Sequence, residues 1–184
     1  YSGLYDNATA LDPDNNLYPL FDSADTIITV CPTDGTDGEI AYAFKSAQGS
    51  YSPIDGSVGD VAGFEVNATG NGTLLRGTIL KNCASDVTGD GDGTAYNLGA
   101  VDAAQSVYAA LHVYEFDGGT LDLAIQSDDN ESMTSAIERI GFTNAADVTT
   151  EWATTSGAIT DTWWRVSYTY DGTACKFIVT MMIT

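Results

Sequence analysis

The residues best suited to chemistry are aspartates in a glycine-rich stretch, CASDVTGDGDG, at positions 83–93. Asp86, Asp90 and Asp92 offer the hard carboxylate oxygens that Ca²⁺ prefers. The full calcium-loop pattern, D-x-[DN]-x-[DN]-G with a distal Glu, is missing. A solvated segment is therefore favoured over a metal site, and the acidic run at 128–130 is interpreted in the same way. We expect no bound metal.

The common catalytic motifs are missing from the chain, including G-x-S-x-G, H-E-x-x-H and the phosphate-binding P-loop. His112 is the single histidine, and its place between Leu111 and Val113 predicts that it packs and hydrogen-bonds within a sheet. Close carboxylate pairs of the kind that hydrolyse glycosides are inevitable among 26 acidic residues, so they indicate little. We predict that the protein is not an enzyme and needs no cofactor.

Three tryptophans, Trp152, Trp163 and Trp164, could form an aromatic platform on which sugars stack. Adjacent residues of a strand point to opposite faces, so Trp163 and Trp164 face opposite ways. We predict that Trp164 lies in the core and that Trp152 and Trp163 lie at a surface or interface. Arg165 is one of only 6 basic residues, and we expect it to form an ion pair between strands or subunits.

The elements that would position these residues are strands with alternating apolar faces. The run VYAALHVYEFDGGTLDLAIQS at 107–127 predicts a β-hairpin whose turn is formed by residues 117–119. Its first arm is apolar on both faces, which is typical of a strand covered on both sides. A second hairpin is predicted at 163–183, with its turn at 171–173. The alternation places eight residues in the core: Leu111, Val113, Leu123, Ile125, Trp164, Val166, Phe177 and Val179.

Short apolar runs separated by Gly, Asp, Asn and Pro predict a mostly β fold, with two antiparallel β-sandwich or barrel-like domains. At most one short helix is expected, within residues 12–21, where Asp12 and Pro13 fit a helix start. We predict a first β domain at 1–82, a Gly/Asp-rich linker at 83–93 and a β-sandwich at 94–184 that folds by itself.

The charge of the chain limits its partners. The 26 acidic and 6 basic residues give a formal net charge of −20. Phosphate binding draws on clustered Lys and Arg, so the composition argues against specific nucleic-acid binding and against anionic membrane surfaces. No apolar run is long enough to span a membrane. Cys31, Cys83 and Cys175 are interpreted as free thiols, with one long-range disulfide left open.

Several stretches resemble bacteriophage virion proteins. The run GSVGDVAGFEVNATGNGTLLRGTIL at 56–80 is similar to the segment that closes the tube-forming domain of major tail proteins, the tail-tube subunits of long-tailed bacteriophages. YSGLYDNATALDPDNNLYPLF at 1–21 and TIITVCPTDG at 26–35 look like a strand, a short helix and the next strand of that domain. ALHV, GGTLDLAIQSDD and ITDTWWRVSYTYDGT, within 110–173, are similar to a β-sandwich module of phage virion proteins.

The resemblance implies a tail-tube subunit that assembles with copies of itself into rings around a DNA-conducting lumen, in contact with other virion proteins and located in the virion. It implies no catalytic residues. Family members carry further strands ahead of the position that matches Tyr1, so we expect either a trimmed form of the tube domain or a smaller fold. Two other functions stay open: a capsid decoration protein that makes shell contacts, and a carbohydrate-binding or adhesive β-sandwich.

Overall fold

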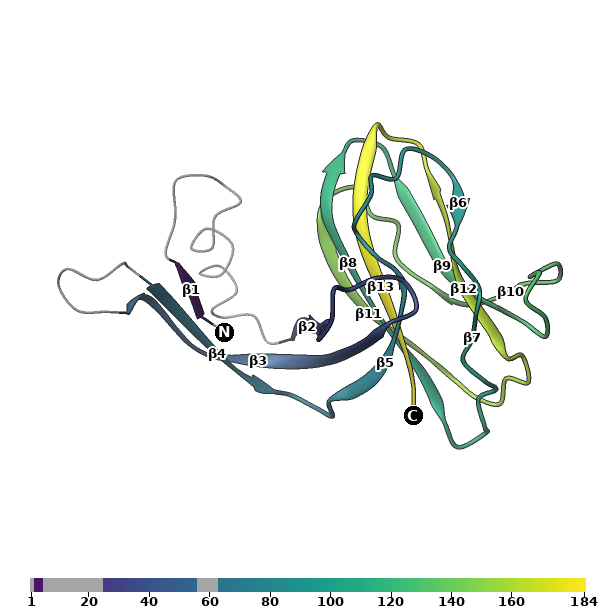
Figure 1. Cartoon of the computed structure of the whole chain (residues 1–184), viewed down its shortest axis with the longest axis horizontal. Coiled ribbons are helices and arrows are strands. Elements are labelled where there is room, and N and C mark those ends of the chain that lie inside the picture. Colours follow the sequence, from purple (N-terminus) through teal and green to yellow (C-terminus); the bar gives the residue numbers. More distant parts are fainter. Residues whose placement is uncertain (1, 5–24, 56–62) are drawn as a thin grey trace. The chain divides into compact units, whose positions relative to one another are not determined.

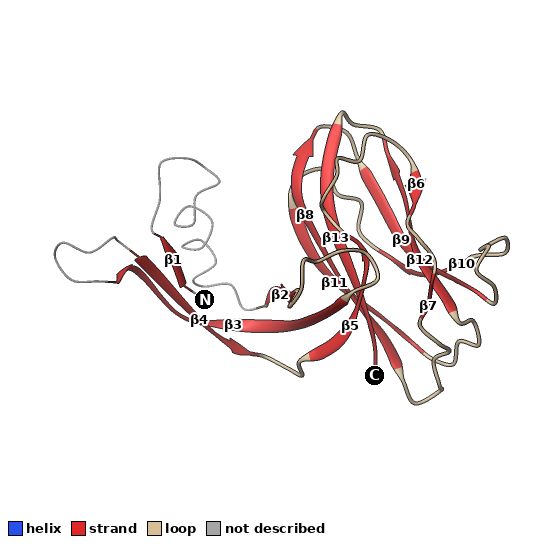
Figure 2. Cartoon of the chain, viewed as in Figure 1, coloured by secondary structure: helices blue, strands red, loops and turns tan. Residues whose placement is uncertain are grey.

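A computed structural model describes residues 2–4, 25–55 and 63–184, and within these ranges every regular element is a β-strand (Figures 1 and 2). The prediction of a mostly β, antiparallel sandwich or barrel-like fold is confirmed. The short helix predicted within 12–21 lies outside the described residues. In the ranges that are described, no helix has the length and apolar character needed to cross a membrane.

The chain divides into two compact units. We call Tyr1–Ile28 with Phe44–Leu74 the hairpin unit, and Thr29–Ala43 with Leu75–Thr184 the sandwich unit. Two strands contribute residues to both units: β2, Thr26–Val30, and the long β3, Ile40–Asp55. The division therefore differs from the predicted boundary at 83–93, which falls inside the sandwich unit.

In the hairpin unit, the second part of β3 pairs antiparallel with β4, Gly63–Gly70, and β4 pairs in turn with β1, Ser2–Leu4. The β3–β4 register breaks at two irregular points, between residues 48 and 50 and between residues 52 and 55. Asn71, just after β4, donates its backbone N–H to the Lys45 carbonyl at 2.8 Å and its side-chain amide to Asp25 at 3.1 Å. Together, β1, β4 and the second part of β3 form a narrow antiparallel sheet.

The sandwich unit has two antiparallel sheets. The first sheet has the order β5-β13-β8-β11. In it, β5 is Leu75–Lys81, β13 is Ala174–Ile183, β8 is Ser106–Asp117 and β11 is Thr149–Ser156. Residues 40–43 of β3 pair with β5. The second sheet has the order β10-β9-β12-β6, and β7 also pairs with β12. In it, β10 is Ile137–Gly141, β9 is Leu121–Asp128, β12 is Trp163–Tyr170, β6 is Gly91–Asp92 and β7 is Tyr96–Asn97. Figure 1 shows these two layers packed face to face.

The core of the sandwich unit lies between these sheets. The eight residues that alternation placed in the core all belong to one buried cluster, and none is more than 4% exposed. Trp164 is fully buried, and its indole N–H donates to the Gly99 carbonyl at 2.9 Å, so its polar atom is satisfied. Residues of β5 and of the 83–101 segment complete the cluster, among them Leu80, Val87 and Val101.

The two predicted hairpins are instead connections between sheets. β8 belongs to the first sheet and β9 to the second, and β12 and β13 are divided in the same way. The predicted turns do occur at the expected residues, with Gly118 and Gly119 at φ of 70° and 78°. The hairpin prediction was wrong because the same apolar alternation fits two arrangements. Two consecutive strands can lie side by side in one sheet, or they can face each other across the core from two sheets. Each pair of strands meets face to face, and other strands supply the hydrogen bonds.

These two connections pack against each other. A Cβ added at Gly119 would come within 2.4 Å of the Gly172 nitrogen, so the backbones are in close contact. The hydroxyl of Tyr170 lies 2.9 Å from the Gly118 carbonyl oxygen in the first connection and 2.9 Å from the Ala174 carbonyl oxygen at the start of β13. Tyr170 therefore fixes the two crossings to each other.

The segment 83–93, predicted as a linker, is part of the sandwich. Val87 is buried and bridges to Cys175, and Gly93 donates its N–H to the Val166 carbonyl at 2.8 Å. β6 pairs with β12. Its Gly and Asp content is typical of a flexible connection, but the segment pairs at a sheet edge through backbone hydrogen bonds, which need no apolar side chains.

The three cysteines are free thiols, and burial raises the pKa of Cys175 to about 11.

Candidate interaction site

The feature that most resembles a functional surface is the edge of the first sheet formed by β11, Thr149–Ser156. β11 pairs with β8 along its whole length, from Thr149 opposite Val113 to Ser156 opposite Ser106, without a bulge. No other described strand is hydrogen-bonded to it. In a strand paired on one side only, alternate N–H and C=O groups point away from the sheet, so β11 presents unpaired backbone groups.

The protection of β11 differs from that of the other sandwich edges. β10 is short and bulged, and it carries Glu138 and Arg139. β6 and β7 have only two residues each. β11 has eight residues, no Lys or Pro, and Glu151 as its single charge. Because bulges, charges and short strands are the usual protection of edges, β11 is the open edge among the described strands of this unit.

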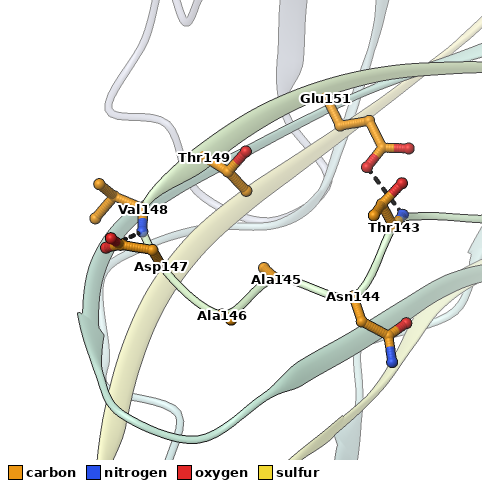
Figure 3. A pocket seen from close by; sticks show the side chains of 8 residues that line it. All are labelled: Thr143, Asn144, Ala145, Ala146, Asp147, Val148, Thr149 and Glu151. Atoms are coloured by element: carbon orange, nitrogen blue, oxygen red, sulfur yellow. Dashed lines mark hydrogen bonds between the residues drawn. The ribbon is translucent and has the colours of Figure 1, made fainter.

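A shallow pocket lies beside the first half of β11. It has a volume of about 260 Å³ and is lined by eight residues: Thr143, Asn144, Ala145, Ala146, Asp147, Val148, Thr149 and Glu151. Figure 3 shows the loop from β10 passing along the pocket, with Thr143 and Glu151 close together near one end and Asp147 and Val148 near the other. Glu151 accepts the Thr143 N–H at 2.9 Å, and Val148 is 55% exposed.

Aromatic side chains lie on the outer face of the first sheet, which points away from the second sheet. The Trp152 ring lies 5.9 Å from that of Tyr108 at an interplanar angle of 46°. Trp152 is opposite Ala110 in the β8–β11 register, and its neighbours on the same face, Thr150 and Thr154, are exposed. This half-buried pair gives the edge an apolar, aromatic surface.

His112 lies on the same face but is buried. Its Nε2 is 2.9 Å from the Thr29 hydroxyl, and its ring stacks on Tyr114 at 6.2 Å. Burial lowers the pKa of His112 to about 4. The histidine is therefore a neutral, hydrogen-bonded sheet residue.

The other predicted surface residues do not join Trp152. Trp163 belongs to β12 in the second sheet, so the three tryptophans form no common platform. Arg165 pairs with Asp92 across strands at 3.0 Å and donates twice to the Gln126 side chain, at 3.0 and 3.1 Å.

The three aspartates of the 83–93 segment have separate partners. Asp86 lies 3.5 Å from Lys176, Asp90 accepts the Tyr170 N–H at 3.0 Å, and Asp92 pairs with Arg165. Within the described ranges no three His, Cys, Asp or Glu side chains are grouped as a metal site would require. The carboxylates hold the segment to β12 and β13.

A buried polar network escaped the sequence analysis. The Ser127 hydroxyl, fully buried, donates to Asp161 at 2.7 Å, and Arg139 donates to both, at 2.8 Å each. The Ser127 hydrogen bond, followed by the Arg139 guanidinium, lowers the pKa of Asp161. The partners are 12 and 34 residues away from Ser127, so no local pattern could have revealed them. The network ties β9 and β10 to the segment before β12.

Comparison with known proteins adds no family. No family model matches the chain, and a search of curated proteins gives no match. One similar solved structure is the N-terminal endo-1,4-beta-D-xylanase 10B of Clostridium thermocellum, with CBM22-1 and GH10 modules, complexed with xylohexaose. The TM-score is 0.32 at 12% identity, covering 88% of this chain and 24% of that chain. This chain thus spans about a quarter of that protein. A likeness this distant carries no argument about function.

Proposed function

We propose that the protein is a virion structural protein, a tail-tube subunit that assembles with copies of itself into rings around a lumen through which DNA passes. The sequence similarity of 56–80, 1–21 and 26–35 to major tail proteins supports this proposal. The similarity of 110–173 to a virion β-sandwich module adds to it.

The structural observation that carries the proposal is the form of the hairpin unit. Among its residues whose side chains are described, Ser46 is the single buried one, and every described side chain from Glu65 to Leu74 is exposed. A narrow sheet with so little burial gains stability when neighbouring copies extend it. The sandwich unit has its own two-sheet core and does not need this help.

The net charge of −20 is consistent with a lumen that conducts DNA, because an anionic wall repels the phosphate backbone. The same charge opposes assembly, since carboxylates on neighbouring copies repel one another. Screening shortens that repulsion from about 30 Å at about 0.01 M salt to about 8 Å at about 0.15 M. Assembly should therefore increase with ionic strength.

The test is sedimentation velocity of the full chain across this salt range, with negative-stain microscopy of the products. Rings or short tubes should appear as salt rises. Thr69→Glu, on the exposed part of β4, should reduce them, whereas Thr88→Glu adds the same charge in the sandwich unit and should not. A chain that stays monomeric at every salt concentration would refute the tube proposal. Compact trimers without a lumen would favour the decoration protein instead.

A second function, binding of neutral glycans, is favoured by the Tyr108–Trp152 pair with the exposed Thr150 and Thr154 beside it. Aromatic faces stack on sugar rings, and hydroxyls hydrogen-bond to them. A glycan array with the full chain tests this function, and Trp152→Ala should abolish any signal.

A further inference from the structure

The β11 edge has the properties of a self-pairing surface. Its eight residues, TTEWATTS, are nearly neutral in a chain whose formal net charge is −20. The single carboxylate, Glu151, already accepts the Thr143 N–H. A second copy of this chain would meet strong repulsion at most surfaces, but little at this one.

The sequence of β11 is compatible with antiparallel pairing to itself. A two-fold axis perpendicular to the sheet keeps each face in place, so one residue must lie opposite its own copy, with the axis midway between the two. With the axis at Ala153, Trp152 lies opposite Thr154 of the second copy and Glu151 lies opposite Thr155. No like charges are opposed in this register, and each aromatic ring meets a threonine on the outer face.

We propose that β11 pairs antiparallel with β11 of a second copy, joining the first sheets of two sandwich units into one continuous sheet. In this register, the second copy's chain leaves its own β11 at Ser156 and passes the pocket lined by Thr149 and Glu151. The residues that follow, Gly157 and Ala158, are small enough to pass the exposed Val148. The pairing satisfies backbone groups that the edge otherwise leaves to water.

This contact goes beyond the proposed ring. A two-fold contact closes on itself and gives a dimer, whereas a ring requires two different surfaces on each subunit. The two proposals therefore predict different species, and either can fail without the other.

The experiment compares three forms of the full chain by sedimentation velocity, from low concentration up to roughly 100 µM at physiological salt. The edge variant is Thr150→Glu with Ser156→Glu, which in this register places glutamates directly opposite each other. Both positions are exposed. The control is Ser85→Glu with Thr88→Glu, which adds the same charge at exposed positions in the 83–93 segment. Thermal unfolding at low concentration checks that both variants are folded.

We expect wild type and control to shift from monomer to dimer with concentration, and the edge variant to lose that shift. Amide hydrogen exchange at 149–156 should slow as wild-type concentration rises, and only in the forms that dimerise. A wild type without dimers, or an edge variant that dimerises like the control, would overturn the proposal. Protection at 149–156 in rings alone, without dimers, would also overturn it and would assign the edge to the ring contact.

Discussion

At the scale of single residues, His112 shows how burial sets chemistry. It lies on a strand covered on both faces, is 9% exposed and hydrogen-bonds to Thr29. Desolvation disfavours its charged form and lowers its pKa from 6.5 to about 4. The same burial that rules out a role as a solvent-exposed base makes this residue a source of acid sensitivity.

We expect the free energy of unfolding to fall as pH drops from 6.5 to about 4, because the unfolded chain binds the His112 proton in this range and the folded protein does not. Above pH 6.5 the histidine is neutral in both states and contributes no slope. The full effect is about 3 kcal/mol. Urea unfolding at several pH values measures it.

The control for this measurement is His112→Asn, which removes the titrating group. Its stability should change less between pH 6.5 and pH 4.5 than that of the wild type. Equal slopes in the two proteins would show that His112 does not carry the acid sensitivity.

Each carboxylate of the 83–93 segment is held by a different protein group: Asp86 by Lys176, Asp90 by the Tyr170 N–H and Asp92 by Arg165. We therefore expect chelation by EDTA to leave the melting temperature unchanged. A drop of several degrees that calcium reverses would contradict this assignment.

At the scale of elements, stability depends on how closely strands approach. β5 pairs with β13, and an ideal Cβ placed on Gly77 would lie 2.0 Å from the Met181 carbonyl oxygen. Since that oxygen belongs to the backbone of the neighbouring strand, it cannot move aside cheaply. Gly77 is thus required by the packing of two strands rather than by a turn.

We expect Gly77→Ala to lower the free energy of unfolding by about 3 kcal/mol, because the methyl group forces the two strands apart. Gly89→Ala is the matched control, since a Cβ there has nothing within 4 Å. Urea denaturation of both variants measures the difference. Similar midpoints for the two would show that β5 and β13 can separate at little cost.

At the scale of the whole molecule, the sandwich unit is assembled from distant parts of the chain. Residues 29–43 and 75–184 belong to it, and Leu80 and Val87, both before residue 94, lie in its core. That 94–184 folds by itself stays a prediction, and the fragment lacks β5 and β6.

We expect a fragment of residues 75–184 to unfold cooperatively, and a fragment of residues 94–184 to show a broad transition at lower temperature. Circular dichroism during heating distinguishes them. Equal, sharp transitions for both fragments would show that β5 and the 83–93 segment add little to the core.

The class of fold, the positions of the turns and the buried face of each strand can all be predicted from the amino-acid sequence. The burial of Leu111, Ile125 and Phe177 could be predicted because alternation of apolar and polar residues shows which side of a strand faces the core. Adjacent residues of a strand point to opposite faces, which likewise predicted that Trp164 is buried and that Trp163 faces the other way. These properties are local, so a single sequence contains them.

Which strands lie side by side became clear from the three-dimensional fold alone. Backbone hydrogen bonds are the same for every residue type, so alternation could not distinguish a hairpin at 107–127 from a crossing between sheets. For the same reason, the Gly/Asp-rich segment at 83–93 could pair with β12 while resembling a linker. The order of strands places β11 at the end of the first sheet, so its outer edge has no described neighbour. The same order places Trp152 and Trp163 in different sheets.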